Sequence, residues 1–327
     1  MLFVAGVVVW LVVNGVKEPA DFIEVSLIGL TTGCLYALIA LGYTLVYGIL
    51  ELINFAHGDV FMLGGMISAT FVASVFGLSG DNRGVGTWLL VIVVLLIAMA
   101  ACGVINATIE FVAYRPLRSA PRLAPLITAI GVSFILQDIG LAWKGPNFVG
   151  VPAVFPRSDV FSIRGVDYEW NKLIVVLITV PVLLVLVWLI QHTKQGKAMR
   201  ATAQDMDAAA MMGINVNRTV SFTFVIAGAL AGAAGLLYAL YVTNIRFDQG
   251  FQLGLIAFTA AVFGGIGNLP GAVLGAILIG FIQAWNEGLA WHAPGSDWTQ
   301  SIVFAILILI LVFRPEGLLG ERTPEGG

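Results

Sequence analysis

Two polar stretches interrupt the apolar sequence and could form a path for a polar solute. The first reads Asn-Phe-Ala-His-Gly-Asp over residues 54–59, at the end of a long apolar run. Polar side chains at membrane depth are costly, and they usually face the interior of a helix bundle or water. The alternative is a loop at the membrane edge, where polar residues cost little. We predict that four residues of this stretch line a translocation path: Asn54, His57, Gly58 and Asp59.

The second stretch, residues 264–271, is rich in glycine and reads Gly-Gly-Ile-Gly-Asn-Leu-Pro-Gly. It superficially resembles a phosphate-binding loop, but the chain contains no G-x-x-x-x-G-K-[ST] motif, so ATP binding through such a loop is not expected. Irregular backbone is tolerated in a membrane only where it is shielded from lipid. We predict that five residues of this stretch line the same path: Gly264, Gly265, Gly267, Asn268 and Pro270.

A third stretch, residues 200–215, has the composition of a short helix outside the membrane. It is rich in Ala and Met and has no Gly or Pro before Gly213, which is well placed to stop the helix. Because its side chains are small, such a helix can pack closely against a partner protein. The alternative is an ordinary amphipathic connector between two membrane helices.

Other reactive side chains are scattered. His57, His192 and His292 lie far apart, and none sits beside a nucleophile, so no catalytic set is visible and the chain is not expected to be an enzyme. His57 and Asp59 lack a third or fourth ligand nearby, so neither a metal nor another cofactor is expected. The two cysteines, Cys34 and Cys102, lie in apolar stretches and are predicted to be small buried hydrophobes.

Two further acids lie within apolar stretches, and either could relay protons. Glu110 is five residues from Arg115 near the end of a predicted span, which favours snorkelling toward the membrane surface. Asp138 follows Gln137 in an otherwise apolar segment and is a further candidate for lining the path.

The composition places most of the chain in lipid. Hydrophobic residues make up 59% of 327 positions, charged residues only 11%, and the mean hydropathy is +0.97. Soluble domains carry roughly 25% charged residues. The net charge of −3 and the absence of a basic patch give no indication of nucleic-acid binding.

The apolar segments predict an all-α, polytopic transmembrane bundle with about 8–9 membrane segments, forming a single domain over residues 1–327. A spanning helix needs about 20 apolar residues. At 1.5 Å per residue, segment 253–283 would run about 46 Å, beyond a hydrocarbon core of about 30 Å. Its central Gly and Pro residues favour two half-helices, either as a re-entrant pair or as a kinked span. The predicted spans are 2–16, 25–50, 60–78, 88–112, 123–143, 172–191, 219–241, 253–283 and 298–313.

Charged loops set the orientation. Lys and Arg concentrate in short cytoplasmic loops of membrane proteins. They cluster in loop 113–122 and again in loop 192–218, and two spans separate these loops, so both can face the cytoplasm and loop 144–171 then lies outside. The basic residues concerned are Arg115, Arg118, Arg122, Lys194, Lys197, Arg200 and Arg218. A row of small residues over 227–235 predicts close helix packing, because small residues let backbones approach in lipid.

These motifs occur in an order that resembles the high-affinity branched-chain amino-acid ABC transporter permeases of the LivH type. The resemblance covers roughly residues 25–315. The motifs that carry it are Gly29-Leu30-Thr31, the run ALIALGYTLVYG over 37–48, INFAHG over 53–58, the stretch 200–215, AFTAAV over 257–262 and GGIGNLPGA over 264–272. Within 200–215, Asp207-Ala208-Ala209, three residues and Gly213 resemble the EAA-x-x-x-G loop of such permeases, with Asp in place of Glu.

The resemblance implies a multi-pass permease of the bacterial inner membrane that works by ATP-driven alternating access. Its implied partners are a second, homologous permease in a heterodimer, two ATP-binding subunits and a periplasmic solute-binding protein, besides membrane lipid. It assigns contact with the ATP-binding subunits to Arg200, Asp205, Asp207, Ala208, Ala209 and Gly213. The family also includes permeases for other amino acids, urea and amides, so the solute is not fixed. A stand-alone secondary transporter or a channel is the alternative.

Overall fold

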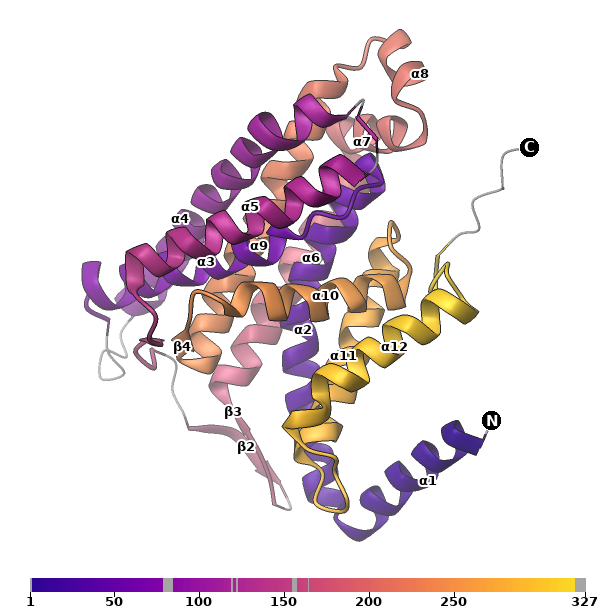
Figure 1. Ribbon diagram of the computed structural model, residues 1–327. Coiled ribbons are helices and arrows are strands. Elements are labelled where there is room, and N and C mark those ends of the chain that lie inside the picture. The colour runs from indigo at the N-terminus through magenta and orange to yellow at the C-terminus, as the bar shows by residue number, and fades with distance from the viewer. Residues whose placement is uncertain are drawn as a thin grey trace.

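The computed structural model describes residues 2–78, 85–118, 120–121, 123–154, 158–163 and 165–320. Nearly all of this is helical (Figure 1). The longer helices are α1 (Leu2–Lys17), α2 (Pro19–Leu50), α3 (Ala56–Thr70), α4 (Val85–Ile109), α5 (Leu123–Lys144), α6 (Trp170–His192), α9 (Val216–Val242), α10 (Gln249–Gly264), α11 (Leu269–Gly288) and α12 (Thr299–Phe313).

Short elements join these helices. They are the π-helices η1 (Phe71–Val75) and η2 (Glu110–Tyr114), the 3-10 helices η3 (Arg115–Leu117) and η4 (Ser296–Trp298), and the short helices α7 (Lys194–Gln204) and α8 (Met206–Met211). Two small antiparallel sheets complete the fold. Strand β2 (Asp159–Ile163) pairs with β3 (Val166–Glu169), and β1 (Val149–Gly150) pairs with β4 (Asn244–Ile245).

The predicted number of membrane segments is confirmed. In the described part of the chain, eight helices are long and apolar enough to cross a membrane. The predicted span 2–16 is not among them, because residues 6–17 of α1, like α10, form a shorter apolar helix. Segment 253–283 is indeed two helices, α10 and α11, separated at residues 265–268. In Figure 1, α10 lies across the bundle, whereas α2 and α11 run along it.

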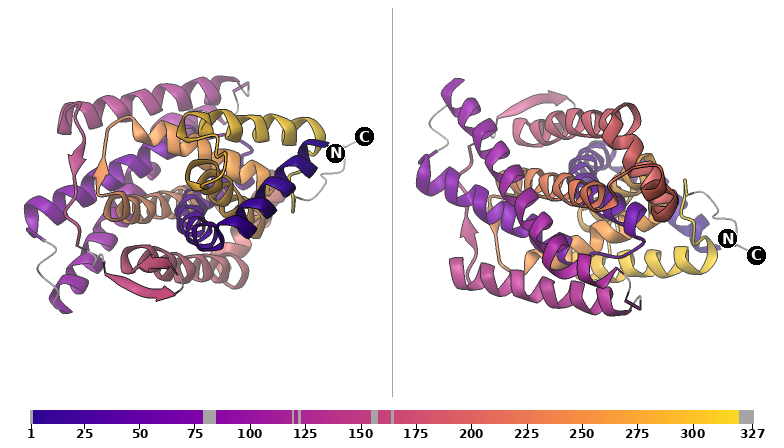
Figure 2. Two further views of the ribbon diagram at one scale, coloured as in Figure 1. Left: turned by 90° about the horizontal axis from the view of Figure 1, so that it is seen from below. Right: turned by 90° about the horizontal axis from the view of Figure 1, so that it is seen from above.

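The helices divide into a central and a peripheral set. The apolar stretches of α2 and α9 are each 72% buried, whereas those of α5 and α12 are only 22% and 11% buried. Outer helices carry large exposed apolar side chains, such as Leu96 of α4 and Leu184 of α6. Since water would strongly disfavour such a surface, its natural surroundings are lipid or another apolar protein surface. Figure 2 shows α5 and α6 on opposite sides of the bundle.

The bundle has two distinct ends. Helices α7 and α8 project at one of them, which we call the α7–α8 end, and the β2–β3 hairpin lies at the other (Figure 1). The two arginine- and lysine-rich loops meet at the α7–α8 end, because Arg118 donates a hydrogen bond to Asn217 Oδ1 at 2.7 Å.

Small residues allow the central helices to touch backbone to backbone. A Cβ atom on Gly232 of α9 would lie 2.9 Å from the backbone nitrogen of Met99 in α4, and one on Gly235 would lie 2.5 Å from the backbone oxygen of Phe61 in α3. Contacts this close exclude any larger side chain. The predicted packing role of the small residues over 227–235 is therefore confirmed, and it lies within the bundle.

Helices α2 and α11 depend on the same kind of contact, and this generates a prediction. A Cβ atom on Gly280 would lie 2.5 Å from the backbone oxygen of Gly29. Gly280→Ala should therefore push the helices apart and lower the free energy of unfolding by about 1–3 kcal/mol, as overpacking does. Thermal unfolding of purified protein in detergent would measure the loss.

Gly131→Ala in α5 is the matched control. A Cβ atom there meets nothing within 4 Å. Because Ala favours a helix over Gly, this variant should be as stable as the native chain or slightly more stable. Equal melting temperatures for the two variants would contradict the role given to Gly280.

Candidate functional site

The first polar stretch lies inside the bundle. His57, Gly58 and Asp59 form the first turn of α3 and are buried, and the His57 and Asp59 side chains have no exposed surface. The His57 ring packs against the Cα of Gly42 and lies edge-on to the Tyr43 ring at 4.9 Å. Gly42 is about 12 Å from the end of α2 at 1.5 Å per residue. These three residues therefore belong to a buried helical turn and not to a loop.

Asp59 is connected to a neighbouring helix by hydrogen bonds. Ser133 of α5 donates to Asp59 Oδ2 at 2.5 Å, and Gln137 donates to Ser133 Oγ at 3.3 Å. A buried carboxylate is costly unless hydrogen bonds compensate for lost water. The other oxygen of Asp59 and both ring nitrogens of His57 have no hydrogen-bond partner among the described residues. This polar cluster is thus only partly satisfied.

Glycine closes the bundle beside this cluster. A Cβ atom on Gly58 would lie 2.8 Å from the Cα of Gly254, and one on Gly250 would lie 2.9 Å from the Cα of Asp59. The start of α3 and the start of α10 are therefore in backbone contact. Any solute that passes here needs the two helices to separate.

The glycine-rich stretch 264–271 forms the turn between α10 and α11. Gly265 and Gly267 have positive φ values of 112° and 93°, which disfavour other residues. Asn268 caps α11, because its Oδ1 accepts from Gly271 N at 3.0 Å, and its side-chain nitrogen donates to Leu319 O at 2.8 Å. The turn is therefore tied to the C-terminal segment that follows α12.

The structure does not bring the two polar stretches together. Gly58 meets the start of α10, whereas Gly264 ends that helix, so the stretches lie at opposite ends of α10. Gly267 lies near Gly48, close to the end of α2. The glycine-rich turn is thus at the α7–α8 end, beyond the deeper His57 cluster.

The third stretch forms two helices, which corrects the expectation of one helix over 200–213. Helix α7 ends at Gln204 and α8 begins at Met206. Asp205 adopts an extended backbone conformation, and its Oδ1 accepts from the backbone N–H groups of Asp207 at 2.8 Å and Ala208 at 2.9 Å. An aspartate that caps a new helix in this way ends the previous one.

Gly213 stops α8, as predicted. Its φ is +83°, and Ile214 N donates to Ala209 O at 3.0 Å while Gly213 N donates to Ala210 O at 3.0 Å. This pair of bonds is the Schellman arrangement, which glycine favours. Ala209 is buried, whereas Asp205, Asp207 and Gly213 are exposed and Ala208 is half-buried.

The surface of α8 is unusually apolar for an exposed end. Met211 and Met212 are 82% and 85% exposed, although flexible methionine side chains normally fill apolar gaps. Arg200 makes a contact within the chain. Its guanidinium donates to the backbone oxygen of Ile190 and so anchors α7 to the end of α6.

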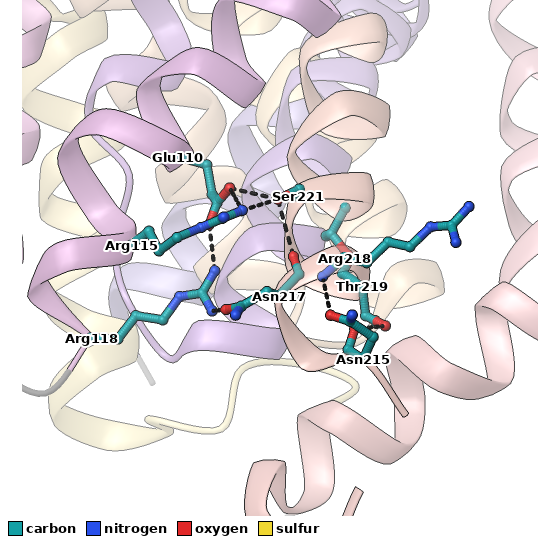
Figure 3. Close-up of polar contacts among 9 residues, drawn as sticks. Glu110, Arg115, Arg118, Asn215, Asn217, Arg218, Thr219 and Ser221 are labelled. Carbon is teal, nitrogen blue, oxygen red and sulfur yellow. Dashed lines mark hydrogen bonds and ion pairs between the residues drawn. The ribbon is translucent and has the colours of Figure 1, made fainter. Parts of the chain in front are cut away.

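A charged network joins the two basic loops beside these helices (Figure 3). Glu110 begins the π-helix η2 and is fully buried. It forms ion pairs with Arg118 and, at 3.0 Å, with Arg115, and it accepts a hydrogen bond from Ser221 at 2.7 Å. The expected snorkelling of Glu110 is therefore wrong, because the arginines reach inward to the carboxylate.

The same π-helix contacts the His57 region. Tyr114, the last residue of η2, donates to Asn54 Oδ1 at 2.7 Å, and the tyrosine is buried. Asn54 lies just before α3 and is also buried. Polar contacts at the two ends of η2 thus link it to the first turns of α9 and to the start of α3.

Sequence reasoning missed several members of this network. Tyr114, Ser133 and Ser221 gave no signal, because single hydroxyl groups in apolar segments are common and need no partner far along the chain. Asp138 is exposed on the outer surface of α5, outside the buried cluster. Arg122 lies outside the described residues.

The fold and this polar core define a multi-pass membrane transport subunit. The family model described as "Branched-chain amino acid transport system / permease component" matches residues 26–312. The chain therefore belongs to this family, whose members are permease subunits of ABC transport systems of the inner membrane. It is a transport subunit, not an enzyme, and it works in a complex with other subunits.

Curated relatives cover almost the whole chain. The high-affinity branched-chain amino acid transport system permease protein BraD of Pseudomonas aeruginosa is 38% identical over 94% of this chain and 99% of its own length. The permease protein LivH of Escherichia coli is 37% identical over 93% of this chain and 97% of its own length. A more distant relative, the autoinducer 2 import system permease protein LsrD of Salmonella paratyphi B, is 26% identical over 72% of this chain. No solved structure matches.

The Glu110 network generates a stability prediction. Glu110→Ala leaves two arginines without their buried partner, and breaking a buried pair in this way costs about 3–5 kcal/mol. The melting temperature of the detergent-purified protein should fall clearly. Asp248→Ala is the matched control, because it breaks the partly exposed pair with Arg246 and should change stability much less. Equal losses in the two variants would show that the Glu110 network adds no special stability.

Proposed function

We propose that this chain forms part of the membrane path of an ATP-driven importer of branched-chain amino acids. The proposal rests on helices α7 and α8, which project from one end of the bundle. Helix α8 is short and exposed, and two exposed methionines lie at its end, just before Gly213. A free apolar helix of this kind fits a cleft on a partner subunit. The substrate class is taken from the relatives BraD and LivH, whose names specify branched-chain amino acids.

The proposed complex contains a second, homologous permease, two ATP-binding subunits and a periplasmic solute-binding protein. The coupling residues are Asp205, Asp207, Ala208, Ala209 and Gly213, which form or stop α8, and Arg200, which fixes α7 to α6. The basic loops put the α7–α8 end in the cytoplasm and loop 144–171, with its β2–β3 hairpin, outside. The whole chain acts as one permease domain.

Motion of α8 reaches the membrane core through the Glu110 network. Helix α9 begins directly after α8, and its side chains Asn217 and Ser221 contact Arg118 and Glu110. From Glu110, the rigid turn of η2 leads to the Tyr114–Asn54 hydrogen bond. A shift of α8 would therefore be transmitted to the start of α3.

In this mechanism the proposed path residues form two groups at different depths in the bundle. The first group lies at the contact between α3 and α10, and its unsatisfied polar groups gain water or solute when the two helices part. It comprises Asn54, His57, Gly58 and Asp59. The second group forms the exit nearer the cytoplasm and comprises Gly264, Gly265, Gly267, Asn268 and Pro270. A bistable contact of this kind suits alternating access, because packed interfaces move between discrete states.

The exposed methionines supply a test of coupling. The double variant Met211→Ser, Met212→Ser removes apolar surface from α8 without touching the bundle, so it should reduce by at least tenfold the amount of ATP-binding subunit that co-purifies in detergent. Trp298→Ser is the control, since Trp298 is 59% exposed at the other end of the bundle. Undiminished co-purification of the methionine variant would exclude α8 as the docking element.

Transport itself is tested with the complete importer in proteoliposomes. Radiolabelled leucine should accumulate only when the binding protein is present on one side and ATP on the other. Unlabelled isoleucine or valine should compete, and urea should not. If the chain moves leucine alone along a proton or sodium gradient, a secondary transporter replaces the importer.

A further inference from the structure

Helix α5 exposes an acid on an otherwise apolar surface. Ile127, Gly131, Phe134 and Asp138 follow the i, i+4, i+7, i+11 spacing of one helix face, and all four are exposed. Asp138 forms no hydrogen bond or ion pair with a described residue. The described part of the chain therefore offers no group that compensates the charge of this acid.

The depth of Asp138 argues against lipid as its neighbour. Trp143 and Lys144 end α5, with the Lys144 ammonium 4.9 Å from the Trp143 ring, and aromatic and basic residues of this kind mark the membrane boundary. Asp138 is about 9 Å further along the helix. A short carboxylate side chain cannot extend that far, unlike the long lysine and arginine side chains that snorkel. An unpaired acid at this depth needs water or a polar partner.

Polar groups continue from Asp138 toward the buried Asp59 cluster. The adjacent Gln137 begins the hydrogen-bonded chain through Ser133 to the buried Asp59. The exposed face of α5 thus combines an acid with the apolar surface of Phe134 and Ile135, and the adjacent Gln137 connects it to the buried cluster.

We infer that this α5 face borders the aqueous solute path and that Asp138 binds the ammonium group of the passing amino acid. A branched-chain amino acid carries an ammonium group and an aliphatic side chain, which match the acid and the apolar surface beside it. The inference rests on the proposed import of amino acids. The second permease would then close the path from the opposite side.

Cysteine labelling tests the inference in membrane vesicles that contain the complete transporter. The probe is 2-(trimethylammonium)ethyl methanethiosulfonate, a cation that does not cross lipid. Asp138→Cys should react with this probe. Leucine with the binding protein should slow the reaction of Phe134→Cys, which keeps the acid, severalfold. Leu177→Cys in α6 is the depth-matched control, because Leu177 is 56% exposed on the opposite side of the bundle, about 10 Å from the same end. The native cysteines, Cys34 and Cys102, are buried.

A second measurement keeps Asp138 itself in place. In Phe134→Cys, the cationic reagent should react about tenfold faster than its anionic sulfonatoethyl counterpart, because the nearby carboxylate attracts cations. Adding Asp138→Asn should bring the two rates together, whereas Asp138→Glu should preserve the difference. A residue that only braces the fold would not change this ratio.

The results that would overturn this inference differ from those that would overturn the proposed function. If Asp138→Cys and Leu177→Cys are equally unreactive, or if the charge preference at position 134 does not depend on Asp138, the face is not part of an aqueous path. Labelling of Phe134→Cys that leucine does not slow, while glycerol or urea does, would retain the path and reject amino-acid binding. Neither labelling result requires that transport be measured.

Discussion

Backbone contact between helices is the constraint on which this structure depends. Lipid offers no hydrophobic gain when apolar helices associate, so close van der Waals contact must hold them together. Glycines on α9 and α11 let these helices meet α3, α4 and α2 at distances that exclude a Cβ atom. The same contacts keep α3 and α10 closed beside His57. Stability and closure of the proposed path therefore have one physical origin.

Buried polar groups in this bundle differ in how well their neighbours compensate for the loss of water. Glu110 is buried but receives two arginines and a serine, so its charge is compensated. Asp59 is only partly compensated, because one of its oxygens has no partner among the described residues. A carboxylate that is paired at both oxygens suits a rigid connection, whereas a partly paired one suits a place where water or solute enters. This difference separates the proposed coupling elements at the α7–α8 end from the deeper cluster.

The relation between the two ends follows from chain connectivity. Helix α9 continues directly from the α7–α8 unit into the centre of the bundle, where it contacts α2, α3 and α4. A helix transmits displacement along its axis with little loss. The Tyr114–Asn54 hydrogen bond adds a second route, from η2 to the start of α3. The projecting unit is thus mechanically connected to the helices that surround His57.

The sequence by itself determined the membrane class, the spans, the break within 253–283, the small-residue packing over 227–235 and the stop at Gly213, because composition, helix length and glycine geometry act locally. Its ordered motifs also indicated the family. Only the tertiary structure decided that Asp205 divides the helix over 200–213, that Glu110 is buried between arginines, and that the polar stretches lie at opposite ends of α10. Those outcomes depend on partners such as Ser221, which lies 111 positions from Glu110. No local pattern encodes which distant side chain will compensate a buried charge.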